Sequence, residues 1–466
     1  MSTKAGTFRQ RVVEGMADRR VIHSVHNATF HKVDTVAPAL AELGNKDVLR
    51  DLAAQIKQHT LENLPTYLEQ FVESCTRVGT CVHVAPDAAA AVRIIHEIAK
   101  RHGCKLAVKS KSMATEEIEL NDALITAGIR TVETDLGEFI VQLDHDRPSH
   151  IVTPIIHKDR RQVAQAMVRE IGCEYTEDPE KLTMIAREYL RDIFRRCDLG
   201  ITGANFAVAE TGTICLVTNE GNGRMTTTRP RVHVALVGIE KIIPRFRDLP
   251  VFLKLLARSG TGQPLSVYTT LVTGPRRVND ADGPHEVHVV LLDNGRSSLL
   301  GDECMEVLRC IRCGACLNHC PVFRNIGGHA YGGVYPGPIG SLLSPLLFGM
   351  AEYGELPSAS SLCGACRDIC PVKIDIPALL IKLRARCRTW QKFSKQLSMA
   401  AWRRAVGSKF FYETAQKVMR IALGRGKGGW TAGGLGPMGE WTKVRDLPPP
   451  PKKSFRQVWK EGLGDE

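Results

Sequence analysis

Two patterns of apolar residues divide the first 300 residues of the chain. Up to residue 75, apolar residues recur at helical spacing, most clearly in Val36–Ile56 and Leu61–Phe71. From Thr80 onward, short apolar runs typical of strands alternate with amphipathic stretches typical of helices. The first pattern predicts an N-terminal helical segment over residues 1–75, and the second predicts an α/β domain over residues 76–297.

The α/β pattern can be resolved into individual elements. The expected strands are Thr80–Ala85, Lys105–Lys109, Arg130–Asp135, Ile151–Ile156, Gly212–Thr218, Val232–Val237, Ser266–Val272 and Val287–Leu292. The expected helices are Asp87–Lys100, Thr115–Thr126 and Arg161–Ile171. Because strands that alternate with helices are joined by crossover connections, we expect a largely parallel sheet.

The last third of the chain predicts helices and loops. We expect a helical domain over residues 298–390, with a Gly- and Pro-rich loop at Gly327–Ser341 and a helix at Ile376–Trp390. Another helix is expected at Trp402–Leu423, within a C-terminal region of residues 391–466. The end of that region predicts an extended arm, indicated by Gly424–Gly439, by Pro448–Pro451 and by aromatic anchors at Trp430, Trp441, Phe455 and Trp459.

Eight of the chain's fifteen cysteines lie between Cys304 and Cys370. The first cysteine motif is Cys310-Ile-Arg-Cys313-Gly-Ala-Cys316-Leu-Asn-His-Cys320-Pro321, which has the spacing of bacterial ferredoxins. The second cysteine motif, Cys363-Gly-Ala-Cys366-Arg-Asp-Ile-Cys370-Pro371, matches the last three cysteines of the same pattern, and Ser360 stands where its first cysteine would be. These motifs predict two 4Fe-4S clusters that transfer electrons.

In ferredoxins with this spacing, the fourth cysteine of one motif binds the cluster of the other. Cross-ligation assigns Cys310, Cys313, Cys316 and Cys370 to a complete first cluster. The second cluster then has only three thiolates, from Cys320, Cys363 and Cys366. Cys304 and Cys387 are the two cysteines that could supply a missing ligand.

Zinc is the alternative metal for paired cysteines, because Cys-x-x-Cys units also build structural zinc sites. A zinc site needs four ligands and has no preference for proline after its last cysteine, whereas both motifs end in Cys-Pro. Iron–sulfur chemistry is therefore favoured. Since Cys363 follows Cys320 by 43 positions, an all-α two-cluster domain fits better than a compact βαβ ferredoxin.

Charge is unevenly distributed along the chain. Of the net charge of +12, residues 381–466 supply +13, from 19 Lys and Arg against 6 Asp and Glu. Such a region can bind nucleic acid or an anionic membrane, but no helix-turn-helix, RNA-binding or zinc-finger signature accompanies it. We expect it to dock an acidic partner subunit instead.

Composition and hydropathy indicate where the protein works. Apolar residues make up 43% and charged residues 24% of the chain, as in globular proteins. No apolar run reaches the length of a membrane-spanning helix, and charged residues interrupt the first twenty positions, where a secretory signal would be apolar. We therefore expect a cytoplasmic protein.

Four further segments carry a family resemblance. They are Val108–Ile118, Glu133–Glu138, Pro148–Val152 and Gly203–Thr213, which look like the LUD domain. Together with the cysteine motifs and the Tyr331–Gly340 loop, the chain resembles the lactate utilization protein B family over its whole length. The resemblance implies an iron–sulfur subunit that acts with two partner proteins, A and C, to oxidise L-lactate to pyruvate. It also implies that the LUD fold is similar to sugar-phosphate isomerases and CoA transferases.

The α/β domain has its own candidate site residues. Lys109–Glu117 is a strand-to-helix turn with two lysines, which suits either an anion site or a plain capping box formed by Ser112 or Thr115. The Glu133–Glu138 and Glu210–Thr213 turns lie at strand ends, where open α/β sheets bind ligands. Glu210 is a candidate nucleophile by analogy with CoA transferases.

Three functions follow from these observations. The first is an electron-transfer subunit of an oxidoreductase that oxidises L-lactate. The second is an enzyme whose LUD domain itself binds an organic acid or acyl thioester. The third is a structural scaffold with one degraded cluster site. Neither a dinucleotide-binding glycine motif nor a Walker loop occurs, so no nicotinamide or ATP site is indicated.

Overall fold

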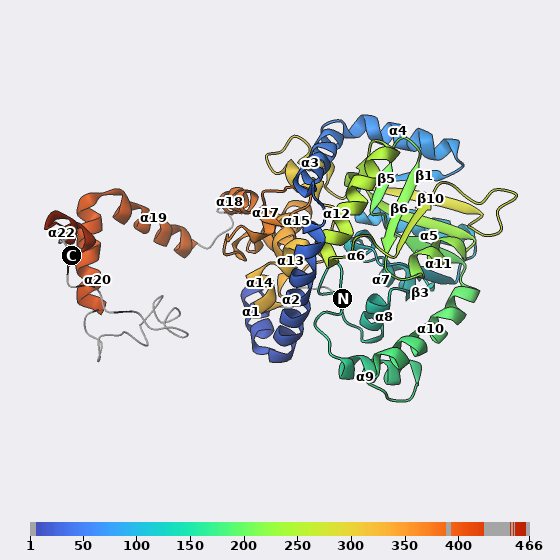
Figure 1. Cartoon of the computed structure of the whole chain (residues 1–466), viewed down its shortest axis with the longest axis horizontal. Helices are drawn as coiled ribbons and strands as arrows, with labels where there is room; N and C mark the ends of the chain where they lie inside the picture. The colour runs from blue at the N-terminus through green and yellow to red at the C-terminus, as the bar shows by residue number, and fades with distance from the viewer. Residues whose placement is uncertain (1–5, 388–392, 424–447, 449–450, 452, 463–466) are drawn as a thin grey trace. The chain divides into compact units, whose positions relative to one another are not determined.

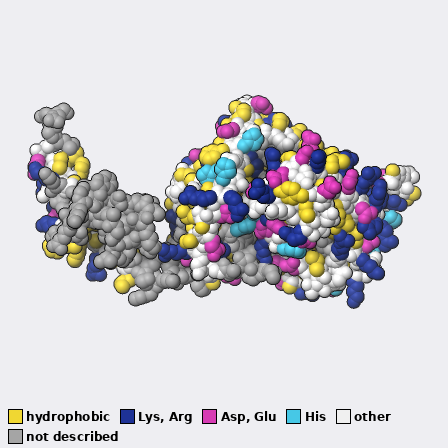
Figure 2. Space-filling model, turned by 90° about the horizontal axis from the view of Figure 1, so that it is seen from below, with side chains coloured by type: hydrophobic (Ala, Val, Ile, Leu, Met, Phe, Trp, Pro, Cys, Tyr) yellow, Lys and Arg dark blue, Asp and Glu magenta, His cyan; other side chains and the backbone are white. Residues whose placement is uncertain are grey.

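A computed structural model describes residues 6–387, 393–423, 448, 451 and 453–462 (Figure 1). The chain divides into two compact units, Met1–Cys387 and Arg388–Glu466. None of the described helices is long and apolar enough to cross a membrane. Figure 2 shows one face of the molecule, on which basic and acidic side chains of the first unit are mixed rather than separated.

The first unit begins with four helices, as the apolar spacing predicts. They are α1 (Phe8–Ala17), α2 (Arg19–Ala41), α3 (Lys46–Glu62) and α4 (Leu64–Arg77). Thr7 and Gln10 form a capping box at the start of α1, and the Asp18 carboxylate caps α2. The apolar sides of the four helices pack against later parts of the chain, so this N-terminal helical segment contributes to the core of the first unit.

A six-stranded parallel sheet forms the centre of the α/β region, in the order β1-β10-β7-β4-β2-β3. Its strands are β1 (Cys81–Ala85), β2 (Leu106–Lys109), β3 (Arg130–Glu133), β4 (Leu199–Thr202), β7 (Val232–Gly238) and β10 (Glu286–Leu292). Successive residues of β7 point to opposite faces of the sheet, so Val234 belongs to one apolar cluster and Ala235 to another. Both faces are therefore covered, which explains the nearly unbroken apolar run of this strand.

Helices and a second sheet cover the two faces. The helices are α5 (Ala88–Arg101), α6 (Met113–Glu117), α7 (Leu120–Thr126), α8 (Leu136–Leu143), α9 (Arg160–Ile171), α10 (Pro179–Arg196), α11 (Asn222–Thr228) and α12 (Leu249–Thr261). The second sheet has the order β8-β5-β6-β9, with β5 (Phe206–Val208), β6 (Thr213–Thr218), β8 (Ile242–Ile243) and β9 (Tyr268–Val272). Only the β5–β8 pair in it is parallel.

Two sequence expectations differ from the structure in this region. Ile151–Ile156 is not a strand, because Pro154 interrupts it and the His150 imidazole accepts the backbone N–H groups of Val152 and Thr153, which bends the chain. The expected helix Thr115–Thr126 is divided into α6 and α7 at Glu119, whose φ is +50°. The short buried strands β4 and β5 and the helices α10 and α12 were not predicted.

The described elements of residues 298–387 are helices and loops. They are the short 3-10 helices at Met305–Arg309, His329–Tyr331 and Leu356–Ser358 and the α-helices α13 (Ala315–Asn318), α14 (Pro321–Ile326), α15 (Gly337–Phe348), α16 (Met350–Tyr353), α17 (Ala365–Asp368) and α18 (Ile376–Arg386). α1 packs against α14, and α12 packs against α13. The cysteine motifs therefore share one core with the N-terminal helices and the α/β region.

The second unit contains α19 (Phe393–Gly407), α20 (Lys409–Leu423) and α22 (Phe455–Lys460). The expected helix Trp402–Leu423 thus consists of two helices that meet at Ser408. Phe455 and Trp459, two of the expected anchors, are exposed on α22. Trp430, Trp441 and the Gly424–Gly439 segment of the expected arm lie outside the described residues.

Candidate functional site

The two cysteine motifs repeat one backbone conformation. Arg312 and Leu362, each directly before a cysteine, have left-handed φ angles of +60° and +57°. Gly314 and Gly364, each directly after that cysteine, are also left-handed and start the short helices α13 and α17. Left-handed conformations cost energy for residues with a Cβ, so their repetition indicates a turn built to point several thiols the same way.

The first cysteine group, Cys310, Cys313, Cys316 and Cys370, comes together from both motifs. Cys313, Cys316 and Cys370 are buried, and Cys310 is half-buried. Burial, followed by the charges of Cys310, Cys313 and Cys370, raises the pKa of Cys316 well above its usual range. Thiols in this setting become thiolates only when a cation compensates their charge, which is what cluster iron provides.

The second cysteine group consists of Cys320, Cys363 and Cys366. Burial raises the pKa of Cys366 to about 12, and the charges of Cys320 and Cys363 act in the same direction. Burial also raises the pKa of Cys320, and the charge of Cys363, the exposed member of the group, acts in the same direction. The charges that act on Cys366 and Cys320 come from the cysteines that cross-ligation predicts for this group, while Cys316 of the first group is also affected by Cys366, so the assignment of each cysteine to a cluster stays a prediction.

Backbone N–H groups point at several of these sulfurs. The N–H of Arg312 donates to Cys310 Sγ over 3.4 Å, that of Phe323 to Cys320 Sγ over 3.5 Å and that of Ile374 to Cys370 Sγ over 3.4 Å. Hydrogen bonds of this kind stabilise thiolate ligands and influence the reduction potential of a cluster.

Ser360 stands in the fourth position of the second group. Its Oγ accepts the N–H of Leu362 over 3.1 Å, just as Cys310 Sγ accepts the N–H of Arg312. The two alternative cysteines have other surroundings: Cys387 Sγ lies 3.4 Å from Met350 Sδ, and Cys304 is buried beside Asp302. Ser360 is therefore the side chain that repeats the geometry of a ligand.

The spacing of the sulfurs argues against zinc. Four thiolates around one zinc ion, with Zn–S bonds of about 2.3 Å, lie about 3.8 Å from one another. Among the described residues, no three of these sulfurs lie within 4.8 Å of each other. A cubane cluster spreads its thiolates over four iron corners, so a wider arrangement is what it requires.

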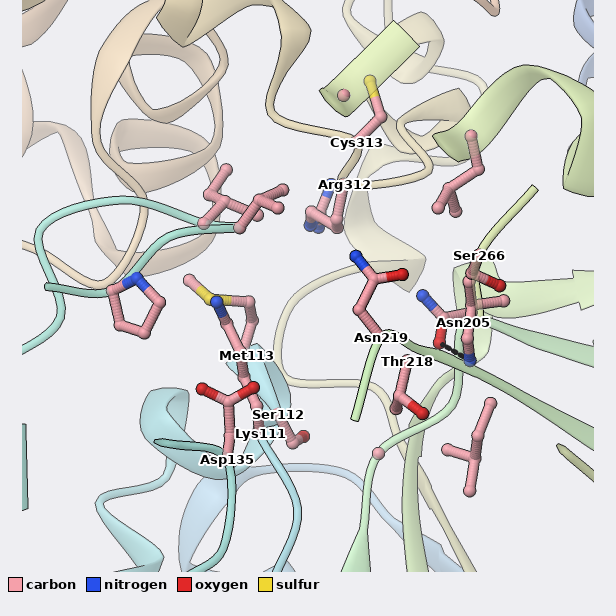
Figure 3. Close-up of a pocket in the computed structure, with 18 of the residues that line it drawn as sticks. Lys111, Ser112, Met113, Asp135, Asn205, Thr218, Asn219, Ser266, Arg312 and Cys313 are labelled. Carbon is pink, nitrogen blue, oxygen red and sulfur yellow. Dashed lines mark hydrogen bonds between the residues drawn. The ribbon is translucent and has the colours of Figure 1, made fainter. Parts of the chain in front are cut away.

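A cavity of about 470 Å³ adjoins the first cysteine group (Figure 3). Lys111, Ser112 and Asp135 reach it from the carboxyl ends of β2 and β3, and Asn205 and Thr218 from the second sheet. Arg312 and Cys313 line the opposite part of the wall. The cavity therefore joins the ligand-binding edge of the α/β sheet to a cysteine motif.

Positive charge is concentrated on one side of this cavity. Glu240 is fully buried between Arg296, at 2.6 Å, and Arg312, at 3.4 Å. Although burial acts to raise it, the charges of Arg296, Lys241 and Arg312 hold the pKa of Glu240 at about 2. Arg296 also pairs with the buried Glu117 at 2.6 Å, so two carboxylates, Glu240 and Glu117, face the cations Arg296, Arg312 and Lys241.

Two of the cations retain unused hydrogen-bond donors. Within the part of the chain that the structure describes, Nε and Nη1 of Arg312 and Nζ of Lys111 are buried without a hydrogen-bond partner. Lys111 has one ion-pair neighbour, Glu138, at 4.0 Å. Sequence reasoning missed Arg312, Arg296 and Glu240, although the position of Arg312 between two cysteines was a signal that it would lie at a cluster.

The sequence-predicted site residues of the α/β region have different outcomes. Lys109 is buried and pairs with Glu133 at 2.7 Å and Glu116 at 2.9 Å. Two carboxylates of the protein itself therefore already compensate the charge that would bind an anion. The capping group of α6 is Ser112, whose Oγ accepts the Thr115 N–H. Glu210 is exposed, accepts the N–H of Phe246 and does not line this cavity. The geometry therefore offers no support for a Glu210 nucleophile.

Comparison with known proteins covers nearly the whole chain. Residues 68–292 match the LUD domain, residues 306–374 the 4Fe-4S dicluster domain and residues 388–462 the C-terminal domain named for lactate utilisation protein B. Lactate utilization protein B of Bacillus licheniformis is 46% identical over 99% of this chain and 98% of its own length. That of Bacillus subtilis is 44% identical over 98% and 97%. An uncharacterized electron transport protein of Escherichia coli, YkgF, is 42% identical over 100% and 99%.

Proposed function

Since the chain belongs to the lactate utilization protein B family, we propose that it is the iron–sulfur electron-transfer subunit of a complex that oxidises L-lactate to pyruvate. In this proposal two 4Fe-4S clusters are held by Cys310, Cys313, Cys316 and Cys370 and by Cys320, Cys363 and Cys366. Two partner proteins, A and C, complete the complex.

The observation that carries the proposal is the grouping of the cysteines. In this proposal each motif contributes to both groups, and it is supported by the position of both motifs within one helical part of the chain. A bound 4Fe-4S cluster supplies one-electron transfer. The chain's own contribution is to bury five of the seven thiolates and to donate backbone N–H groups to three of them.

A growth experiment tests this function. Deletion of the protein should abolish growth on L-lactate and leave growth on pyruvate unchanged, and the wild-type chain should restore the former. A Cys313→Ala chain should not restore it. Normal growth of the deletion strain on L-lactate, in a background without any other lactate dehydrogenase, would contradict the proposal.

The cavity favours a second candidate function, in which the LUD domain itself binds an organic acid. The unused donors of Arg312 and Lys111 line the same cavity, and a guanidinium binds carboxylates in a planar, two-bond geometry. Cys313 forms part of the wall, so a bound acid would lie next to the first cluster.

Titration of the isolated, cluster-loaded chain with L-lactate and with pyruvate separates the two functions. Saturable binding that Lys111→Met weakens about tenfold or more would support the second, because removing a charged partner from a buried site costs about 1.5–3 kcal/mol. Lys100→Met, on the exposed side of α5, is the matched control. If neither acid binds, the substrate belongs to a partner protein.

A further inference from the structure

Two histidines and a glutamate meet at the edge of the central sheet opposite the cavity. His102 follows the last residue of α5, while Glu286 and His288 lie at the start of β10 (Figure 1). Nε2 of His102 lies 3.3 Å and Nε2 of His288 lies 3.4 Å from the same oxygen, Oε2 of Glu286. All three donor atoms lie within 4.8 Å of one another.

These separations match those between the ligands of one tetrahedral metal ion. Zinc binds imidazole nitrogen and carboxylate oxygen at about 2.0–2.2 Å, which places neighbouring donors about 3.3–3.6 Å apart. Neither Nε2 atom has a hydrogen-bond partner among the described residues, although both atoms are buried. One cation bound between the three atoms would satisfy both nitrogens and the carboxylate oxygen at once.

A fourth side chain orients one of the histidines. Nε2 of His83, on β1, lies 3.2 Å from Nδ1 of His288, and the pairing of β1 with β10 fixes this contact. When His288 Nδ1–H is the donor in this contact, the lone pair of His288 Nε2 is free to bind a metal, as is usual for metal-binding histidines. The Arg101 charge near His83 opposes a further cation here.

A second cluster of similar composition shows the contrast. Asp146, His157 and His329 also gather their donor atoms, but Nζ of Lys158 lies 2.6 Å from Asp146 Oδ2. There the lysine already supplies the positive charge that a metal would bring. At His102, Glu286 and His288, no lysine or arginine of the described part of the chain forms such an ion pair with the carboxylate.

We propose that His102, Glu286 and His288 bind one divalent transition-metal ion of the zinc type, with the fourth position open to water. Two histidines and a glutamate are an established ligand set for zinc. The ion would join the end of α5 to the start of β10 and so stabilise this edge of the sheet. It is separate from the cysteine groups, and it does not depend on the function proposed for them.

The test uses the full chain with both clusters filled, prepared without oxygen, so that the cysteines of the two motifs cannot take up zinc. After incubation with zinc and gel filtration, we expect one zinc ion per chain, with X-ray absorption showing nitrogen and oxygen neighbours at about 2.0 Å rather than sulfur at about 2.3 Å. Zinc should also raise the melting temperature of the wild-type chain.

Variants assign the ion to its ligands. Glu286→Gln keeps the shape of a side chain that is 46% exposed, and it should lose the zinc ion and the shift in melting temperature. His102→Ala should do the same, and His83→Phe should weaken binding about 10- to 100-fold. His145→Ala is the control, because His145 lies 3.8 Å from Glu170 without a second imidazole, and it should keep the ion. Zinc content unchanged in Glu286→Gln, or a sulfur shell around the zinc, would overturn the proposal.

Discussion

Ser360 makes the two cysteine groups chemically unequal. Its Oγ occupies the position of a ligand, but a neutral hydroxyl binds iron more weakly than a thiolate does. Cys363, in the same group, is exposed, whereas the first group has no exposed member. Both features leave one iron of the second cluster less protected than the others.

We therefore predict that the second cluster is the labile one. Mild oxidation of the anaerobically prepared wild-type protein should convert about half of the cluster population from a four-iron to a three-iron form, visible by electron paramagnetic resonance. Ser360→Cys should suppress this three-iron signal, because it supplies the missing thiolate. Cys366→Ala should abolish the signal and leave the first cluster largely intact. Equal resistance of both clusters in the wild-type chain would show that another ligand completes the second one.

Glu240 gives a prediction about pH. Its pKa falls from 4.5 to about 2 in the folded protein, so its stabilising effect is fully present above pH 4.5 and is lost as the pH falls toward 2. Glu240→Gln leaves Arg296 and Arg312 without their shared carboxylate and should reduce the free energy of unfolding by about 3–5 kcal/mol at pH 7.

Denaturant unfolding of both chains between pH 7 and pH 3 provides the measurement. The difference between wild type and Glu240→Gln should narrow as the pH decreases below 4.5, because the Glu240 carboxylate of the unfolded wild-type chain then binds a proton while that of the folded chain does not. A constant difference across this range would mean that the charge of Glu240 is not what stabilises the fold.

At the scale of elements, α12 is the helix that positions the first cysteine motif against the α/β region. A Cβ at Gly260 would lie 2.6 Å from the backbone oxygen of Cys313, so glycine permits this close approach. The Gly260 carbonyl also accepts the side-chain N–H of Asn318, and Asn318 contacts His150. The helix, the cysteine motif and the bent 151–156 segment thus share one contact region.

Gly260→Ala should therefore displace the Cys313 loop and make the first cluster easier to lose. Alanine favours the helix by about 1 kcal/mol, but overpacking against a backbone atom costs about 1–3 kcal/mol. Gly407→Ala, in α19, is the matched control, since a Cβ at Gly407 meets no atom within 4 Å. The rate at which cluster absorbance decays in the presence of an iron chelator should rise in the first variant alone.

At the scale of the whole molecule, the basic charge belongs to the second compact unit and the cysteine groups to the first. The boundary between the units follows Cys387, and residues 388–466 carry 16 Lys and Arg against 6 Asp and Glu, a net charge of +10. Trp402 on α19 and Phe410 on α20 are 61% and 72% exposed. Exposed aromatic side chains beside basic ones are typical of protein interfaces.

Truncation after Cys387 should accordingly leave the clusters intact and remove the partner. We expect unchanged cluster absorbance in the truncated chain, together with the loss of co-purification of proteins A and C. Trp402→Ala in the full chain should weaken co-purification without changing the charge. Undiminished co-purification of the partners with the truncated chain would place their binding site in the first unit.

Local patterns in the sequence predicted what depends on near neighbours. The Cys-x-x-Cys-x-x-Cys spacing indicated clusters, and helical spacing indicated α5 and α9, because each depends on residues a few positions apart. Periodicity failed at Ile151–Ile156, where an apolar run with a proline forms a bend. The full-length resemblance to a family was also present in the sequence and is confirmed by the relatives.

The sequence by itself determined the two cysteine motifs, the presence of Ser360 in place of the second motif's first cysteine, and the basic C-terminal region. Residue type and order alone fix these features. Only the tertiary structure decided that Arg312 would turn from a cysteine motif into the cavity of the α/β region, and that His102 would meet Glu286 and His288. Contacts between residues so far apart arise from the packing of α12 against α13 and of α5 against β10, and no local pattern records such packing.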